Sequence, residues 1–354
     1  MDCFGIIEPG KSVGWFENPI PEIGMLDALV RPLAVSPCTS DVHNAFHIGA
    51  PAFLNKRVLG HESLGIVEKV GSLVTDFKPG DKVAVSPVTP DWRSKYAQGK
   101  YPQHTEKFSS SFKFAYHIDG VFSEFYKVPD ADSNLALLPN DISLKAALMT
   151  VDMVNTGFHG VELAGVEFGD TVAVIGIGPV GLMAVAGASL RGAGRIIVVD
   201  NRKNCIDLAI SYGATDVVNY DEGDVAGQIQ ELTKKVGVDK VILAGGNDMT
   251  FNTAVKILKP GGTLANLNFF TGVENLPVPC LQWGCGLAHK TIVGGLCPGG
   301  RLRMEKLLEV VRYKRIDPSH LITHSFDSLA GVEAAFALMA NKPADFIKAI
   351  VFTQ

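Results

Sequence analysis

The chain has 354 residues, of which 47% are hydrophobic and 19% charged, and this balance excludes a disordered protein. The formal net charge is -5 and no block of like charge occurs, which argues against nucleic acid as a partner. The length exceeds that of one ordinary hydrophobic core, so we expect two domains or one domain inserted into another.

The N-terminal sequence and the cysteines bear on the cellular compartment of the protein. The N-terminus lacks a basic segment followed by an apolar core, so no signal peptide is expected. The six cysteines are scattered without Cys-x-x-Cys spacing, which favours a reducing cytoplasm over a disulfide framework. Residues 171–190 carry no charge, but their four glycines and one proline favour a strand, a turn and a helix start over a membrane span.

The first 150 residues read as mostly β-structure. Short apolar runs at 28–35, 65–70 and 82–85 are separated by turn sequences, of which 78–81 (Lys-Pro-Gly-Asp) is the clearest. The irregular stretch 89–120 is rich in Ser, Lys, Tyr and Phe. A loop of that length in a compact domain usually has a functional or interface role.

From about Ala146 the pattern changes to an alternation of strands and helices. We predict strands at 171–176, 195–200, 216–220, 240–244 and 263–269, and helices at 179–190, 204–212, 225–236 and 250–258. Asp224 is placed to cap the third of these helices. The repeat predicts an α/β fold with a doubly wound parallel sheet. Near Cys297 the alternation ends, and helices (303–313, 329–340) and a last strand (347–352) follow.

A dinucleotide-binding loop is predicted after the first strand of this alternation. The residues are Gly176, Ile177, Gly178, Pro179, Val180 and Gly181. The loop follows a buried strand and opens a helix, and an aspartate ends the next strand nineteen residues beyond the third glycine. Glycines at these positions permit the tight turn, the approach of a pyrophosphate and close helix packing, while the helix N-terminus attracts phosphate.

Asp200, the aspartate at that strand end, bears on the choice of cofactor. Its carboxylate can accept hydrogen bonds from both ribose hydroxyls and would repel a 2′-phosphate, which favours NAD. Arg202 and Tyr220 favour NADP, since a guanidinium at this site can pair with a phosphate. A stacking or plain solvated role for Arg202 stays open. Asn201 lies between these residues and is expected at the cofactor site too.

Three widely separated residues are typical zinc donors. Cys38 follows a strand at a predicted helix start, where a thiol loses its proton more readily. His61 precedes a strand, and Asp152 lies in an apolar helical stretch where an unpaired carboxylate is costly. Three protein ligands and one open position are typical of catalytic zinc. Singly, each residue has an ordinary structural explanation, but beside a dinucleotide site the set predicts zinc.

Further motifs occur along the chain. They are found at residues 37–43, 60–62, 89–92, 156–160, 176–181 and 294–305. With them the chain resembles the zinc-dependent medium-chain alcohol dehydrogenases over essentially its whole length. Within that family it is most similar to the secondary-alcohol dehydrogenases of anaerobic bacteria and amoebae.

The resemblance implies an architecture. A Rossmann domain at 154–296 would be inserted into a β-rich, GroES-like catalytic domain made of residues 1–153 and 297–354. Cys38, His61 and Asp152 would bind zinc, with Glu62 as a fourth ligand that can exchange. A cytoplasmic homotetramer is implied.

Three departures from the family pattern affect these expectations. Residues 86–126 contain no cysteine, so we expect one catalytic zinc and no structural zinc. Members of the most similar group prefer NADP and have glycine in place of Asp200. They also have tryptophan in place of Phe112, on the expected wall of the substrate pocket with Leu296 and Cys297.

The expected function is hydride transfer between a nicotinamide cofactor and a small secondary alcohol or ketone, with primary alcohols and aldehydes as further substrates. Ser40 would hydrogen-bond the substrate oxygen, and His43 would pass its proton to solvent; an exposed surface histidine is the alternative for His43. The resemblance also assigns Leu267, Asn268, Phe269 and Lys342 to the cofactor site. Three alternative functions stay open, namely a zinc-free quinone or enone reductase, a polyol dehydrogenase and a non-enzymatic nucleotide sensor.

Overall fold

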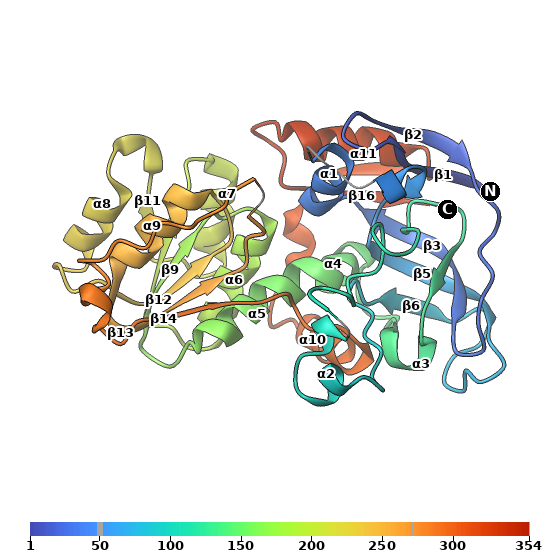
Figure 1. Ribbon diagram of the computed structural model, residues 1–354, viewed down its shortest axis with the longest axis horizontal. Coiled ribbons are helices and arrows are strands. Elements are labelled where there is room, and N and C mark those ends of the chain that lie inside the picture. Colours follow the sequence, from blue (N-terminus) through green and yellow to red (C-terminus); the bar gives the residue numbers. More distant parts are fainter. Residues whose placement is uncertain (48–51, 106, 271, 354) are drawn as a thin grey trace. The chain divides into compact units, whose positions relative to one another are not determined.

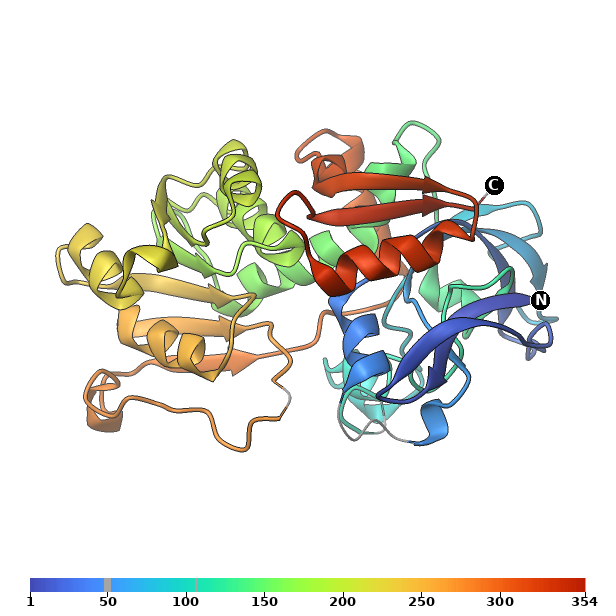
Figure 2. The ribbon, with the colours of Figure 1, turned by 90° about the horizontal axis from the view of Figure 1, so that it is seen from above.

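The computed structural model describes residues 1–47, 52–105, 107–270 and 272–353 (Figure 1). The chain divides into two compact units, the first formed by Met1–Asp152 and Cys297–Gln354 and the second by Met153–Leu296. Both ends of the chain therefore belong to one unit, and the second unit interrupts its sequence (Figure 2). None of the described helices has the length and apolar character that a membrane crossing requires.

The first unit is built on two sheets. The larger has the strand order β15-β16-β3-β5-β6-β8, with β7 paired to β3, and the smaller has the order β2-β1-β4. The strands are β1 (Asp2–Glu8), β2 (Ser12–Glu17), β3 (Ala28–Ser36), β4 (Arg57–Val58), β5 (Glu62–Val70), β6 (Lys82–Val85), β7 (Tyr126–Val128), β8 (Leu135–Leu137), β15 (Ile322–Asp327) and β16 (Lys348–Phe352). The β16–β3 pairing joins the C-terminal strand to the strand that precedes Cys38.

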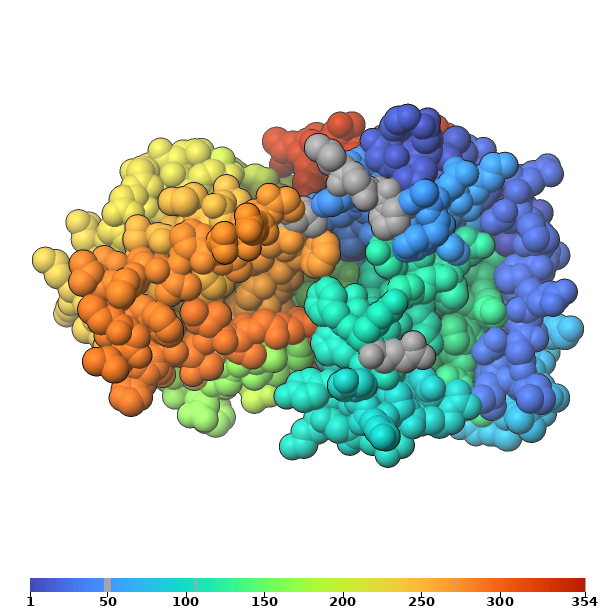
Figure 3. Space-filling view, viewed as in Figure 1, coloured from blue at the N-terminus to red at the C-terminus, as the bar shows by residue number. Residues whose placement is uncertain are grey.

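Short helices and turns cover these sheets. They are α1 (Thr39–Phe46), η1 (Ala52–Leu54), α2 (Lys95–Gln98), η2 (Pro102–His104), α3 (Ala131–Asn134), α4 (Leu144–Met149), η3 (Thr150–Val154), α10 (Arg301–Arg312), η6 (Pro318–Leu321) and α11 (Gly331–Asn341). The core between them is rich in aromatic side chains such as Phe4, Phe122 and Tyr126. Parts of the stretches 89–105 and 107–120 form the turquoise surface of this unit (Figure 3). Tyr96, Tyr101 and Phe108 are exposed there, whereas Phe114 and Ala115 are buried.

The second unit contains one parallel sheet with the order β11-β10-β9-β12-β13-β14. Numbered along the chain this is 3-2-1-4-5-6, the order of a Rossmann fold. Its elements are α5 (Asn155–Ala164), β9 (Thr171–Ile175), α6 (Pro179–Leu190), β10 (Arg195–Val199), α7 (Lys203–Ser211), β11 (Asp216–Val218), η4 (Tyr220–Glu222), α8 (Val225–Leu232), β12 (Val238–Leu243), α9 (Asp248–Ile257), β13 (Leu258–Asn266), η5 (Gly284–Gly286) and β14 (Thr291–Gly294). The central strands are apolar because helices cover both faces.

Two elements, α8 and β13, differ from the sequence prediction by four residues or more at one end. Asp224 caps α8 as expected, accepting a hydrogen bond from the Ala226 amide at 3.1 Å, but the helix ends at Leu232 instead of 236. It ends early because Lys234 and Lys235 adopt left-handed φ angles of 51° and 63°. Strand β13 begins at Leu258 and ends at Asn266, so that residues 267–269 follow the strand instead of forming its end.

Candidate active site

Four predicted metal ligands come together within the first unit. Cys38 is the N-cap of α1, His61 directly precedes β5, Glu62 begins that strand, and Asp152 lies in the π-helical turn η3. One donor atom of each residue lies within 4.8 Å of the donor atoms of the other three. Residues separated by more than a hundred positions in the sequence therefore form a single cluster.

The cluster fits zinc in its chemistry and spacing. The Nε2 atom of His61 lies 3.5 Å from Oδ2 of Asp152, and the Sγ atom of Cys38 lies 3.8 Å from the same oxygen. Typical zinc–ligand bond lengths give tetrahedron edges of about 3.4 Å between N and O and about 3.6 Å between S and O. Glu62 adds a buried Oε2 atom that has no hydrogen-bond partner among the described residues. A cation would satisfy that oxygen.

Asp41 contacts two of the candidate ligands and was not predicted as a site residue. Its buried carboxylate accepts hydrogen bonds from the Cys38 amide at 2.9 Å and the Gly60 amide at 3.0 Å, and contacts Nδ1 of His61 at 3.1 Å. A carboxylate on Nδ1 fixes the tautomer that leaves Nε2 available to a metal. Burial alone would lower the pKa of His61, but Asp41 and Asp152 raise it well above its usual range. An acidic residue three positions after a helix N-cap was the available signal.

Lys348 was not predicted either, yet it contacts the cluster. Its fully buried Nζ atom donates to Oε1 of Glu62 at 2.7 Å and to the carbonyl oxygen of Pro37 at 2.6 Å. Burial raises the pKa of Glu62 to about 7, against the opposing effect of the Lys348 ammonium. A lone lysine in an apolar strand was the sequence signal.

The predicted relay residues lie on α1. The Ser40 hydroxyl lies 3.3 Å from Nε2 of His61, and the Phe112 ring packs edge-on against the His61 ring at 5.0 Å between centroids. Ser40 therefore lies beside the metal-facing nitrogen, and Phe112 packs against the ring that carries it. Burial lowers the pKa of His43, as do the positive charges of Lys342 and His47. Lys342 thus lies near His43, at the C-terminal end of α11.

The predicted dinucleotide loop has the backbone geometry that its glycines allow. Gly176 has a φ of +81°, and a Cβ atom there would lie 2.6 Å from the Gly245 backbone. A Cβ on Gly181 would lie 2.1 Å from the Gly176 carbonyl oxygen. Ile177 is buried, and α6 starts at Pro179. The amide hydrogens of the first turn of α6, beginning with that of Val180, are free of helical partners and can bind a phosphate.

Asp200 and Arg202 form an ion pair. Asp200 accepts hydrogen bonds from Nε of Arg202 at 3.2 Å and Nη2 at 3.0 Å, and from the amides of Ile177, Asn201 and Arg202 at 2.9–3.1 Å. Burial would raise the pKa of Asp200, but these bonds lower it. The Tyr220 hydroxyl donates to Oδ1 of Asn201 at 2.6 Å. The two side chains that favoured opposite cofactors in the sequence therefore contact each other.

The remaining predicted cofactor residues follow β13. Leu267, Asn268 and the exposed Phe269 stand after Asn266, which pairs in register with Leu243. Leu243 in turn pairs with Ile175, the residue before the glycine loop. These residues thus lie at the same carboxyl edge of the parallel sheet as the glycine loop, the edge where such sheets bind ligands.

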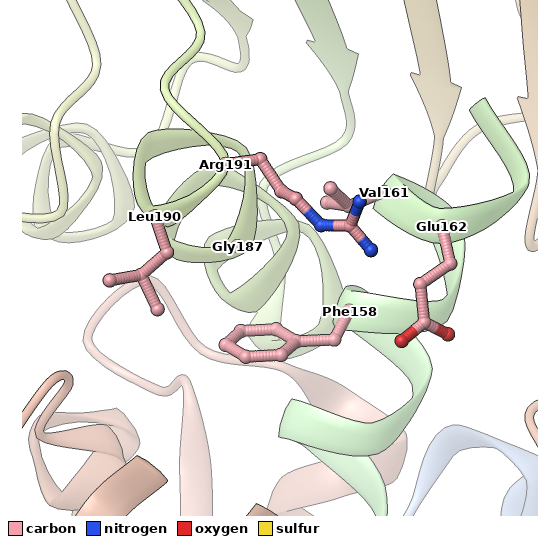
Figure 4. Close-up of a pocket in the computed structure, with 6 residues that line it drawn as sticks. All are labelled: Phe158, Val161, Glu162, Gly187, Leu190 and Arg191. Carbon is pink, nitrogen blue, oxygen red and sulfur yellow. The ribbon is translucent and has the colours of Figure 1, made fainter. Parts of the chain in front are cut away.

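A separate hollow lies on the second unit between α5 and α6 (Figure 4). It is lined by Phe158, Val161, Glu162, Gly187, Leu190 and Arg191. None of these is a predicted site residue, so the hollow is not part of the candidate active site.

Known proteins resemble the chain in sequence and in fold. The family model "Alcohol dehydrogenase GroES-like domain" matches residues 24–140, and "Zinc-binding dehydrogenase" matches 179–312. An NADP-dependent isopropanol dehydrogenase of Thermoanaerobacter brockii is 58% identical over 99% of both chains. The chain belongs to the zinc-binding alcohol dehydrogenase family. It is therefore a zinc-dependent oxidoreductase that acts with a nicotinamide cofactor, and the resemblance predicted from its motifs is confirmed.

Other relatives agree with this assignment. An NADP-dependent isopropanol dehydrogenase of Entamoeba histolytica is 53% identical over 96% of this chain and 92% of its own length. Among solved structures, a zinc-dependent alcohol dehydrogenase from Streptococcus pneumonia superposes with a TM-score of 0.87 at 31% identity, covering 100% of this chain and 99% of the other. The predicted α/β fold with a Rossmann sheet and a GroES-like domain is thereby confirmed.

Proposed function

We propose that this enzyme oxidises small secondary alcohols and reduces the corresponding ketones. The clustering of Cys38, His61, Glu62 and Asp152 carries the proposal, since it unites sulfur, nitrogen and oxygen donors in one buried site. The relatives named as isopropanol dehydrogenases, at 58% and 53% identity, support the secondary-alcohol preference. When bound, zinc supplies the Lewis acidity that polarises an alcohol oxygen, and the nicotinamide takes the hydride.

The protein residues handle the substrate and its proton. Cys38, His61 and Asp152 would hold one zinc ion, and Ser40, beside Nε2 of His61, would hydrogen-bond the substrate hydroxyl. His43, whose ring is exposed to solvent and has a lowered pKa, is neutral near pH 7 and so can accept the proton. The first unit would be the catalytic domain, and the second would bind the dinucleotide through Gly176–Gly181.

NAD is the cofactor that this chain's residues favour. Asp200 is ionised and forms an ion pair with the guanidinium of Arg202, so this guanidinium is not free to pair with a 2′-phosphate. A second carboxylate, Asp221, accepts a hydrogen bond from Asn201 at 2.9 Å and adds negative charge to the same site. NADP is the cofactor in the names of the isopropanol dehydrogenases above, and it could bind here if the Asp200–Arg202 ion pair opened.

A cytoplasmic homotetramer is the proposed assembly. The family resemblance supports it, and β14 is an outer strand that leaves Ile292 exposed at the edge of its sheet. Light scattering after size exclusion would give four times the chain mass of 37.8 kDa. A mass of one chain would contradict the assembly without affecting the chemistry.

An assay of purified, zinc-loaded protein tests the function. Propan-2-ol and butan-2-ol should reduce NAD, and NADP more slowly, while a polyol such as xylitol should be turned over poorly. No reduction of either cofactor across a panel of secondary alcohols would refute the proposal. Quinone reduction by metal-free protein would identify the zinc-free alternative instead.

A further inference from the structure

Lys348 is a buried cation to which the proposed reaction has so far given no role. Its side chain is fully inaccessible to solvent. A lysine ammonium is unfavourable in such a place unless paired charges and hydrogen bonds compensate its lost hydration. Here the compensation comes from Glu62, at 2.7 Å, and from the carbonyl oxygen of Pro37, at 2.6 Å. Both acceptors lie beside a metal ligand, because Pro37 precedes Cys38 and Glu62 follows His61.

The sheet fixes this lysine in place. Strand β16 pairs with β3 through Val351 and Val35, and β3 pairs with β5 through Ser36 and Glu62. The lysine and the glutamate therefore stand on strands that flank β3. Neither backbone can move without breaking strand pairing, so the ion pair is a built feature of the fold.

The two oxygens of Glu62 have different surroundings. Oε1 accepts the Lys348 hydrogen bond and lies 4.0 Å from Nε2 of His61. Oε2 is buried and has no hydrogen-bond partner among the described residues. The carboxylate therefore contacts the ammonium and also lies among the predicted metal ligands. The attraction of the Glu62 carboxylate to the Lys348 ammonium weakens its binding to the metal.

We propose that Lys348 is a positioning residue that weakens the hold of Glu62 on the metal, so that this ligand can give way to the substrate oxygen. The inference rests on the proposed zinc site. Without the ammonium, the metal would be the cation nearest to a buried carboxylate, and Glu62 would become a standing fourth ligand. The metal would then bind more tightly, and an added ligand would bind more weakly.

Cobalt(II) substitution makes coordination visible without turnover, because its visible absorption reports the number and type of ligands. The probe is imidazole, titrated into the cobalt-loaded wild type and the Lys348→Met variant, which has a side chain of similar length without charge. We expect the variant to bind cobalt about tenfold more tightly and imidazole at least tenfold more weakly, with an altered spectrum before imidazole is added. Lys348→Arg keeps the charge and should restore the wild-type spectrum.

Three further variants sharpen the test. Lys82→Met changes an exposed strand lysine of the same unit and should match the wild type. Adding Glu62→Gln to Lys348→Met should restore imidazole binding, since the competing ligand is gone. Lys348→Gln keeps hydrogen-bond donors without charge and replaces the methionine variant if that one fails to fold. It should also bind imidazole more weakly.

The outcomes separate this inference from the proposed function. Equal imidazole affinity and equal spectra in the wild type and the uncharged variants would overturn the role of Lys348 and leave the metal site intact. Wild-type protein that takes up no cobalt would overturn the metal site, and the inference with it.

Discussion

Asp41 shows how one residue organises the site. It bonds the amides of Cys38 and Gly60 and the His61 ring, so it fixes the backbone of one ligand and the tautomer of another. Asp41→Asn keeps the shape but loses the charge that orients the imidazole. We expect zinc affinity to fall by about 10–100-fold, measured by competition with a chromophoric chelator. Asp81→Asn, which affects only a surface turn through the Lys78 amide, is the control. Unchanged affinity in Asp41→Asn would contradict this role.

A second prediction at the residue scale concerns the pKa of His43 and the pH dependence of activity. Burial lowers its pKa, and the positive charge of Lys342 lowers it further. Lys342→Met removes a like charge, so the pKa of His43 should rise toward 6.5. The acid limb of kcat/KM should then move to higher pH, since the relay needs neutral imidazole. NMR titration of the His43 ring in cofactor-free protein checks the sign. A fall in its pKa would contradict the account.

Asp200 determines cofactor choice in this account. Asp200→Gly removes the repulsive carboxylate and also frees the Arg202 guanidinium from its ion pair. We expect kcat/KM for NADP to rise by about 10–100-fold, equal to about 1.4–2.7 kcal/mol, with a loss for NAD. Asp207→Gly, on α7 and paired with the exposed Lys203, serves as the control. An unchanged NADP/NAD ratio would show that Asp200 does not select the cofactor.

At the scale of elements, the packing of α5 on α6 depends on a glycine. A Cβ atom on Gly157 would lie 2.7 Å from the Ala184 amide nitrogen and from the Val180 carbonyl oxygen. Gly157→Ala should therefore destabilise the protein by about 1–3 kcal/mol, despite alanine's better helix propensity. In α8, the three atoms nearest to a Cβ on Gly227 all belong to the Asp224 side chain, which can shift, so Gly227→Ala should cost less than Gly157→Ala. Urea unfolding distinguishes the two, and equal effects would contradict the packing argument.

Site residues whose role depends on one element could be predicted from the sequence, whereas those whose role depends on contacts between elements could not. The motifs around Cys38, His61 and Gly176 were readable because local sequence fixes an N-cap, a strand start and a glycine turn. Asp41 was within the quoted motif, but its role depends on a contact with His61 across two elements. The lone lysine at 348 was visible in an apolar strand, but its partner was not, since Glu62 is 286 positions away and meets it through strand pairing.

At the scale of the molecule, the alternating pattern predicted the Rossmann sheet because each β–α unit is locally encoded. The ends of α8 and β13 were misplaced because left-handed residues and strand register depend on neighbouring elements. The metal cluster and the glycine loop belong to different units, so each can be tested alone. Metal removal should abolish turnover while NAD binding, followed by fluorescence, survives.

The zinc content of the purified enzyme tests the central claim most directly. Elemental analysis should find one zinc per chain, and activity with propan-2-ol should vanish with a chelator and return with added zinc. His61→Ala should lose most of the metal, and Glu62→Ala only a small part. Full alcohol oxidation by protein that contains no zinc would contradict the account.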